Sequence, residues 1–168
     1  MSVVKQSILG WLLAEGIKTE TGVLLEVKDH AFMLEIYRDL SPKQVIMKAA
    51  QVTMSTCAIL KAFWVAKREK MDLIYLLPTD SDRNTFVGGK VNRMIAQNPE
   101  LLKLVKDKDS VEQKQVDDNF IHFRGSWSQK AAIMVPSDLN IYDEVDSSKQ
   151  SVIEMYSSRL QHSRHRWE

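Results

Sequence analysis

Short apolar runs that alternate with helical patterns constrain this sequence more than any other feature. The clearest run is 71–77 (MDLIYLL), which is apolar on both faces and is closed by Pro78. A strand that is apolar on both faces is typical of a parallel sheet covered by helices on both sides. The expected strands are 44–47, 71–77, 119–123 and 139–142, and predicted helices follow them over about 55–70, 82–97, 125–132 and 151–160. This order predicts an α/β domain with three layers and a largely parallel sheet.

Size and charge narrow the class of protein. A chain of 168 residues fits one domain, and its net charge of +1 means that any contact with nucleic acid needs a local basic patch. Its one cysteine, Cys57, cannot form an internal disulfide, which fits a reducing compartment. No run reaches the roughly 18 apolar residues that span a bilayer. We therefore expect a cytoplasmic protein with no membrane partner.

The chain divides into a short lead-in and one core. Residues 1–30 are expected to form a helix, Val3–Glu15, followed by a loop. Residues 31–168 form the expected core and begin with a helix over His30–Leu40 that Pro42 terminates. The charged stretch 106–118 is expected to lie on the surface.

The loop after the first expected strand has the context of a phosphate-binding loop. The pattern G-x-x-x-x-G-K-[ST] needs small residues, a helix N-terminus, a lysine and a hydroxyl. With Ser55 aligned on the final hydroxyl, Thr53 takes the place of the second glycine and Met54 that of the lysine. Lys48 stands at the start of the loop instead, followed by the small residues Ala49 and Ala50. An ordinary strand–turn–helix with Ser55 as N-cap remains the alternative.

A second Gly-Lys pair competes for this role. Gly89-Lys90 lacks the first glycine of the pattern and the hydroxyl residue after the lysine. It also does not directly follow an expected strand, so the loop that begins at Lys48 is the better candidate.

Paired acids follow the last expected strand. Asp143 and Glu144 come directly after the apolar run 139–142. Adjacent carboxylates at the end of a strand point in different directions, so one can face a metal ion and the other a water molecule. In ATPases with a phosphate-binding loop an aspartate in this context holds Mg²⁺, and a neighbouring glutamate can act as general base. A solvated acidic turn is the alternative.

Together these segments resemble the ATPase domain of the large terminase subunit of tailed double-stranded DNA phages. The resemblance runs from Ile36 through Val52 and Ser55, and then through the runs 76–79 and 141–146 in the same order. It covers roughly residues 30–168. It implies a three-layer P-loop NTPase fold of the ASCE type, and several members of the family carry the loop lysine at the position of Lys48.

The resemblance also implies roles for individual residues. Lys48 would bind phosphate and act in catalysis, Ser55 and Asp143 would hold Mg²⁺, and Glu144 would be the catalytic acid. Gln44 lies where related motors recognise adenine, and Tyr37 could stack on that base. The expected nucleotide-binding residues are therefore Tyr37, Gln44, Lys48, Ala49, Ala50, Gln51, Val52, Thr53, Met54, Ser55 and Thr56. The implied cofactors are ATP and Mg²⁺.

Large terminase subunits are motors that use ATP hydrolysis to drive DNA into a preformed capsid. The resemblance therefore implies double-stranded DNA, a portal protein and a small terminase subunit as partners. It also implies a homo-oligomeric ring on the portal when full length, in the bacterial host cytoplasm. Family members usually continue into a coupling segment and a nuclease domain, so this sequence is expected to be a truncated product or a fragment without nuclease activity.

Two other functions stay open. The family usually keeps a glycine where this chain has Thr53, which favours a nucleotide-binding fragment with impaired hydrolysis. A helicase-like translocase is the other alternative, although such enzymes usually have a complete Gly-Lys-Ser/Thr loop.

Overall fold

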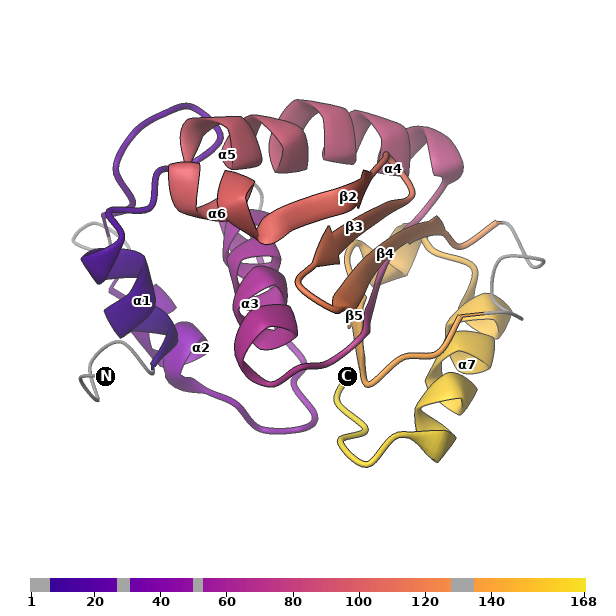
Figure 1. Cartoon of the computed structure of the whole chain (residues 1–168). Helices are drawn as coiled ribbons and strands as arrows, with labels where there is room; N and C mark the ends of the chain where they lie inside the picture. Colours follow the sequence, from indigo (N-terminus) through magenta and orange to yellow (C-terminus); the bar gives the residue numbers. More distant parts are fainter. Residues whose placement is uncertain (1–6, 27–30, 50–52, 128–134) are drawn as a thin grey trace.

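A five-stranded sheet forms the centre of the molecule in the computed structural model, which describes residues 7–26, 31–49, 53–127 and 135–168 (Figure 1). The strand order is β2-β3-β4-β1-β5. The strands are β1 (Leu73–Leu77), β2 (Val105–Asp109), β3 (Gln113–Val116), β4 (Asn119–Gly125) and β5 (Leu139–Tyr142). β1 pairs in parallel with both β4 and β5, whereas β2, β3 and β4 pair antiparallel. The sheet is therefore parallel in the half that contains β5.

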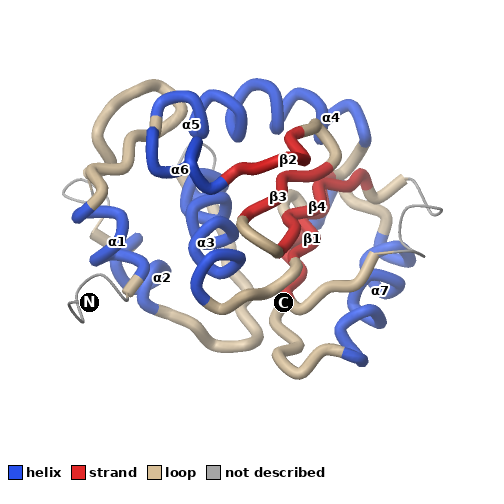
Figure 2. The backbone as a smooth tube through the Cα atoms, viewed as in Figure 1, coloured by secondary structure: helices blue, strands red, loops and turns tan. Residues whose placement is uncertain are grey.

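Alternating side chains of β1 separate the two faces of the sheet. Leu73, Tyr75 and Leu77 face the larger core cluster, to which α3 (Met54–Arg68) contributes most of its buried residues. Ile74 and Leu76 face a smaller cluster with Val152 and Tyr156 of α7 (Gln150–Ser157). Helices thus cover both faces, as Figure 2 shows, and the expected α/β class with helix layers on both faces is confirmed.

The remaining helices pack around the larger cluster. They are α1 (Ile8–Ala14), α2 (Met33–Arg38), α4 (Asp80–Phe86), α5 (Asn92–Gln97) and α6 (Pro99–Leu104), and a π-helical turn, η2 (Val87–Val91), joins α4 to α5. Helical turns η4 (Val145–Ser147) and η5 (Ser158–His162) flank α7. The helices expected over 82–97 and 55–70 are present. The helix expected from Gly125 to Ala132 falls largely on residues 128–134, outside the described part of the chain.

The strand expected over 44–47 was wrong. Residues 43–49 form no strand, and the side chains of Val45 and Met47 are 101% and 100% exposed. The backbone pairs only at one end of this segment: Glu168 donates its N–H to the Pro42 carbonyl (2.8 Å), and Gln44 donates its N–H to the Glu168 carbonyl (3.0 Å). A strand needs a neighbour along its length to satisfy its peptide groups, and beyond Gln44 the described chain supplies none.

The charged stretch 106–118 contains most of the β2–β3 hairpin, whose two strands were not among those expected. Lys114 and Val116 of β3 point inward and are buried. The Lys114 ammonium is paired with the Asp109 carboxylate across the hairpin. The alternation of buried and exposed side chains that marks a strand is hidden in this stretch, because one of the inward-facing side chains is a charged lysine.

In the part of the chain that the structure describes, no helix has both the length and the apolar character needed to cross a bilayer.

Candidate functional site

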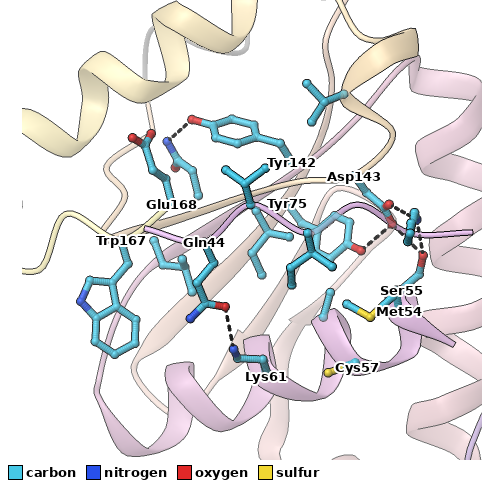
Figure 3. Close-up of a pocket in the computed structure, with 18 of the residues that line it drawn as sticks. Gln44, Met54, Ser55, Cys57, Lys61, Tyr75, Tyr142, Asp143, Trp167 and Glu168 are labelled. Carbon is cyan, nitrogen blue, oxygen red and sulfur yellow. Dashed lines mark hydrogen bonds and ion pairs between the residues drawn. The ribbon is translucent and has the colours of Figure 1, made fainter. Parts of the chain in front are cut away.

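A network of three donors surrounds the carboxylate of Asp143 (Figure 3). The Lys48 ammonium lies 2.5 Å from Asp143 Oδ1, and Ser55 donates its hydroxyl to Oδ2 at 2.8 Å. Tyr75 donates its phenol to the same Oδ2 at 2.9 Å. Lys48 Nζ also donates to Ser55 Oγ at 3.3 Å. The three residues that the sequence assigned to phosphate and metal are thus in mutual contact.

The fold explains why residues so far apart in sequence meet here. Asp143 directly follows β5, and its N–H donates to the carbonyl of Leu76 on β1 (3.0 Å). β1 and β5 are parallel neighbours with Tyr75 opposite Ile141, so the Tyr75 ring reaches toward the carboxyl end of β5. Ser55 lies in the first turn of α3, and Lys48 lies in the segment before it.

Tyr75 was missed in the sequence, where it sits inside the apolar run 71–77 as if it were core. A signal was available, because a buried tyrosine hydroxyl in a strand must find a hydrogen-bond partner. Its position places the ring in the core and its oxygen at the site.

Electrostatics keep Asp143 ionised. Burial leaves its side chain 10% exposed and by itself would raise the pKa of the carboxyl. The hydrogen bonds from Lys48, Ser55 and Tyr75 outweigh burial and hold the pKa of Asp143 below its usual value. For Tyr75, burial and the neighbouring Asp143 charge both raise the phenol pKa, so the phenol stays a donor.

The backbone at the start of α3 is unusual at Thr53. This residue is the N-cap of the helix and has φ 58° and ψ 12°, in the left-handed region. A β-branched side chain is strained there, and glycine is the residue that adopts this conformation without cost. Thr53 stands where the phosphate-binding pattern has its second glycine. The backbone of this chain therefore has a glycine-like conformation at the same position.

Glu144 lies beside the network without joining it. It also has a left-handed backbone, with φ 55° and ψ 53°, and it begins the turn η4. Its side chain is exposed, whereas that of Asp143 points inward. The two acids therefore face different surroundings, as the strand geometry predicted.

Gln44 and Tyr37 lie farther from the network. Gln44 donates to the carbonyls of Asp39 (2.9 Å) and Ser41 (3.0 Å), and its amide oxygen accepts from Lys61 (3.1 Å). Tyr37 is 1% exposed in the core and does not line the cavity beside the network. Gln44 thus lines that cavity, whereas Tyr37 is buried in the core and does not.

Of the other residues expected to bind nucleotide, some line the cavity and one does not. Ala49 and Met54 line the cavity, while Thr56 faces away and donates to Glu20 (3.2 Å). Residues 50–52, with Ala50, Gln51 and Val52, lie outside the described residues. Lys90, the competing lysine, sits in the turn η2 and pairs with Glu20 at 3.3 Å.

The oxygens at the network fit a small divalent cation. Among the described residues no group of three or more His, Cys, Asp or Glu side chains could hold a metal. Mg²⁺ does not need one, since it usually binds one or two protein oxygens together with water and substrate phosphates. Ser55 Oγ and Asp143 Oδ2 are 2.8 Å apart, and the Lys48 ammonium lies against Ser55 Oγ and the other carboxylate oxygen, Asp143 Oδ1. The oxygens that hold this ammonium are of the type that could hold a metal ion in its place.

The depressed pKa predicts how acid affects folding. A carboxyl with a lower pKa in the folded state adds stability above its unfolded pKa, about 4 for aspartate, and loses that contribution as the pH falls through the folded value. The difference in unfolding free energy between the parent and Asp143→Asn should therefore be constant at neutral pH and shrink below about pH 4.

Urea unfolding of both proteins across this pH range measures that difference. Asp146→Asn, at an exposed position on η4, is the matched control and should show a much smaller change. A difference between parent and Asp143→Asn that does not depend on pH would show that the network does not hold an ionised carboxylate.

Comparison with known proteins adds one finding. The family model described as phage terminase large subunit gpA, ATPase domain, matches residues 30–166. No curated protein and no solved structure gave a significant match. The matched region contains every residue of the Asp143 network and most of the chain. The chain therefore belongs to the family of phage terminase large subunit gpA ATPase domains.

Proposed function

We propose that this chain binds Mg·ATP at the Asp143 network and hydrolyses it as the ATPase module of a DNA-packaging motor. The observation that carries the proposal is the convergence of Lys48, Ser55 and Asp143 at the carboxyl end of β5 and the start of α3. Ligands of α/β domains bind at the carboxyl ends of parallel strands. Family membership supports the ATPase role independently.

Phosphate binding would involve Lys48 and the start of α3. This helix has 15 residues, and the unpaired N–H groups and dipole of a helix N-terminus attract phosphate oxygens. Lys48 is 30% exposed, so its ammonium can be reached from solvent. A flexible ammonium can also contact phosphate without fixed geometry.

Metal binding would fall to Ser55 and Asp143. When bound there, Mg²⁺ would neutralise charge that develops on the phosphate oxygens during transfer. Lys48 would leave Asp143 when the metal binds, because the ammonium and the metal ion would compete for the single negative charge of that carboxylate. Released from that pair, Lys48 becomes available for phosphate. Binding of metal and release of the lysine would thus be a single exchange.

Water activation would fall to Glu144. Its carboxylate is exposed next to Asp143 and is absent from the hydrogen bonds that hold Asp143, so it is free to accept a proton from water. A general base must reach the proton that it removes, and the left-handed backbone of Glu144, two residues after the end of β5, goes with a side chain that is exposed beside Asp143.

The motor role involves partners beyond this site. We propose double-stranded DNA, a portal protein and a small terminase subunit as partners in a ring of identical subunits, in the host cytoplasm. Exposed Arg164 and Arg166 near residue 168 form the local basic group that the near-neutral chain would need for contact with DNA phosphates.

Slow hydrolysis is a second candidate, favoured by Thr53. A strained left-handed threonine brings a Cβ and a branched side chain to the loop where glycine would let backbone N–H groups approach phosphate. Met54, which lines the cavity, supplies no charge where the pattern has lysine. The chain would then bind nucleotide and turn it over poorly.

Lys48, and not Lys90, should contact the triphosphate. Lys48→Ala should weaken binding of Mg·ATP by about tenfold or more, the scale of a lost charge-assisted contact. Lys90→Ala should leave the affinity unchanged, because Lys90 pairs with Glu20 away from Asp143. Calorimetric titration of both variants with a non-hydrolysable ATP analogue gives the two affinities. Loss of binding in Lys90→Ala alone would place the nucleotide elsewhere.

Glu144→Gln should keep binding and lose turnover. The amide preserves size but cannot accept the proton, so steady-state phosphate release should fall by about 10² while the affinity for Mg·ATP stays the same. The exposed Asp146→Asn variant is the control. Equal turnover in Glu144→Gln and an active parent would remove Glu144 from the mechanism. A parent that binds Mg·ATP but releases phosphate no faster than Glu144→Gln would support the second candidate.

A further inference from the structure

The segment 17–25, which we call the lead-in hairpin, lies ahead of the region 30–166 that the family model matches. Its two arms pair antiparallel at Lys18 and Leu24. Figure 1 shows this segment in indigo, beside α5 and α6. The hairpin carries Glu20, whose carboxylate makes contacts with α3 and η2 but none within the Asp143 network.

Asn98, which lies between α5 and α6, holds the hairpin in place. Its amide oxygen accepts from the Lys18 N–H (2.7 Å), and its amide nitrogen donates to the Lys18 carbonyl (2.8 Å). The same nitrogen donates to the Met94 carbonyl (2.8 Å), and Asn98 is 2% exposed. Ile17, next to Lys18, is buried in the larger core cluster. Because buried hydrogen bonds are costly to break, these contacts fix the position of Glu20, two residues farther along.

Both carboxylate oxygens of Glu20 have partners. Oε2 accepts from the Thr56 hydroxyl at 3.2 Å, and Oε1 pairs with the Lys90 ammonium at 3.3 Å. Thr56 lies in the first turn of α3 and is buried. Lys90 belongs to the π-helical turn η2, a kind of turn that is frequent at functional sites. Glu20 thus connects the lead-in hairpin to the first turn of α3 and to η2.

The first turn of α3 depends on contacts with the rest of the molecule. Its N-cap, Thr53, has a strained left-handed backbone and makes no side-chain capping hydrogen bond. Two neighbouring hydroxyls attach the turn to its surroundings instead. Ser55 donates to Asp143 on the side of the cavity. Thr56, which does not line the cavity, donates to Glu20.

The proposed binding of Mg²⁺ would affect these two contacts differently. The metal would take the oxygens of Ser55 and Asp143, so the hydrogen bond between them would be replaced by bonds to the ion. The bond from Thr56 to Glu20 lies outside the cavity and would persist. It would therefore hold the first turn while the contacts on the cavity side change.

We propose that Glu20 is a positioning residue for the metal site, because through Thr56 it holds the first turn of α3 where Ser55 can bind Mg²⁺. This ion requires near-ideal octahedral geometry, so a small displacement of one ligand weakens its binding. Glu20 itself touches neither metal nor nucleotide and acts only through the helix. The inference rests on the proposed function and gives a role in it to a segment outside the matched region.

Thr56→Val tests this role, since it removes the hydroxyl but keeps the branched shape at a buried position. The quantity to measure is the Mg²⁺ gain, the ratio of the ATP dissociation constants without and with Mg²⁺. Calorimetric titration gives both constants. Thr56→Val should reduce the gain by about tenfold relative to the parent, the scale of one lost hydrogen bond to a charged group. Thr56→Ser keeps the hydroxyl and should restore the gain of the parent.

Lys90→Ala is the matched control. It removes the partner of Oε1 and leaves the bond from Thr56 to Oε2, so its Mg²⁺ gain should equal that of the parent. Glu20→Ala removes both contacts and should reduce the gain as Thr56→Val does.

Amide hydrogen exchange reports on the first turn without nucleotide. The Cys57 N–H donates to the Thr53 carbonyl (3.0 Å), so its exchange measures opening of that turn. Exchange at Cys57 should be about tenfold faster in Thr56→Val than in the parent, and unchanged in Lys90→Ala.

A contact that serves only overall stability would give a different result. The unfolding midpoint of Thr56→Val would fall, while its Mg²⁺ gain and its exchange at Cys57 would equal those of the parent. That result would overturn the inference and leave the proposed function intact. A parent whose ATP affinity shows no Mg²⁺ gain would instead overturn the proposed metal site, and this inference with it.

Discussion

The buried carboxylate of Asp143 is the group around which this structure is organised. A charge with a 10% exposed side chain is costly to bury unless donors compensate it. Here the donors come from three parts of the chain: Lys48 before α3, Ser55 within it, and Tyr75 in the middle of the sheet. Parallel pairing of β1 with β5 sets the distance from Tyr75, and packing of α3 on the sheet sets the distance from Ser55. The positions of the site residues thus depend on packing in the core as well as on the segment before α3.

This arrangement gives a physical meaning to the displaced lysine. Lysine is usually placed directly before the hydroxyl residue in phosphate-binding loops. In this chain Met54 occupies that place and packs at the edge of the core, while Lys48, seven positions before Ser55, reaches the Ser55 hydroxyl and the Asp143 carboxylate. At Thr53 the backbone has the left-handed conformation that glycine adopts without strain, although the residue is a threonine. A threonine in this conformation is strained, and its side chain would hinder the approach of phosphate to the backbone. Slow hydrolysis is therefore a candidate as well as rapid hydrolysis.

The sequence was most informative where a single pattern determined the structure. Strand β5 matches its expected bounds because an apolar run stops at an acidic pair, and β1 lies within its expected run before Pro78. The family resemblance placed Lys48, Ser55 and Asp143 in one site, and the structure brings them into contact. Tyr75 was not predicted as a site residue, because a tyrosine within an apolar run is usually a core residue. The β2–β3 hairpin escaped notice because its inward face carries Lys114, which only pairing with Asp109 makes tolerable. Residues 44–47 have the composition of a strand but no partner along their length, a fact that local sequence does not contain.

The proposed role of Asp143, a magnesium ligand that exchanges with Lys48, can be measured directly. ATP affinity should be compared with and without Mg²⁺, in the parent and in Asp143→Asn. If the carboxylate holds the metal while Lys48 turns to the phosphates, Mg²⁺ should strengthen ATP binding in the parent and have little effect in the variant. The same gain from Mg²⁺ in both proteins would contradict this, because the metal would then bind without the carboxylate around which the site is built.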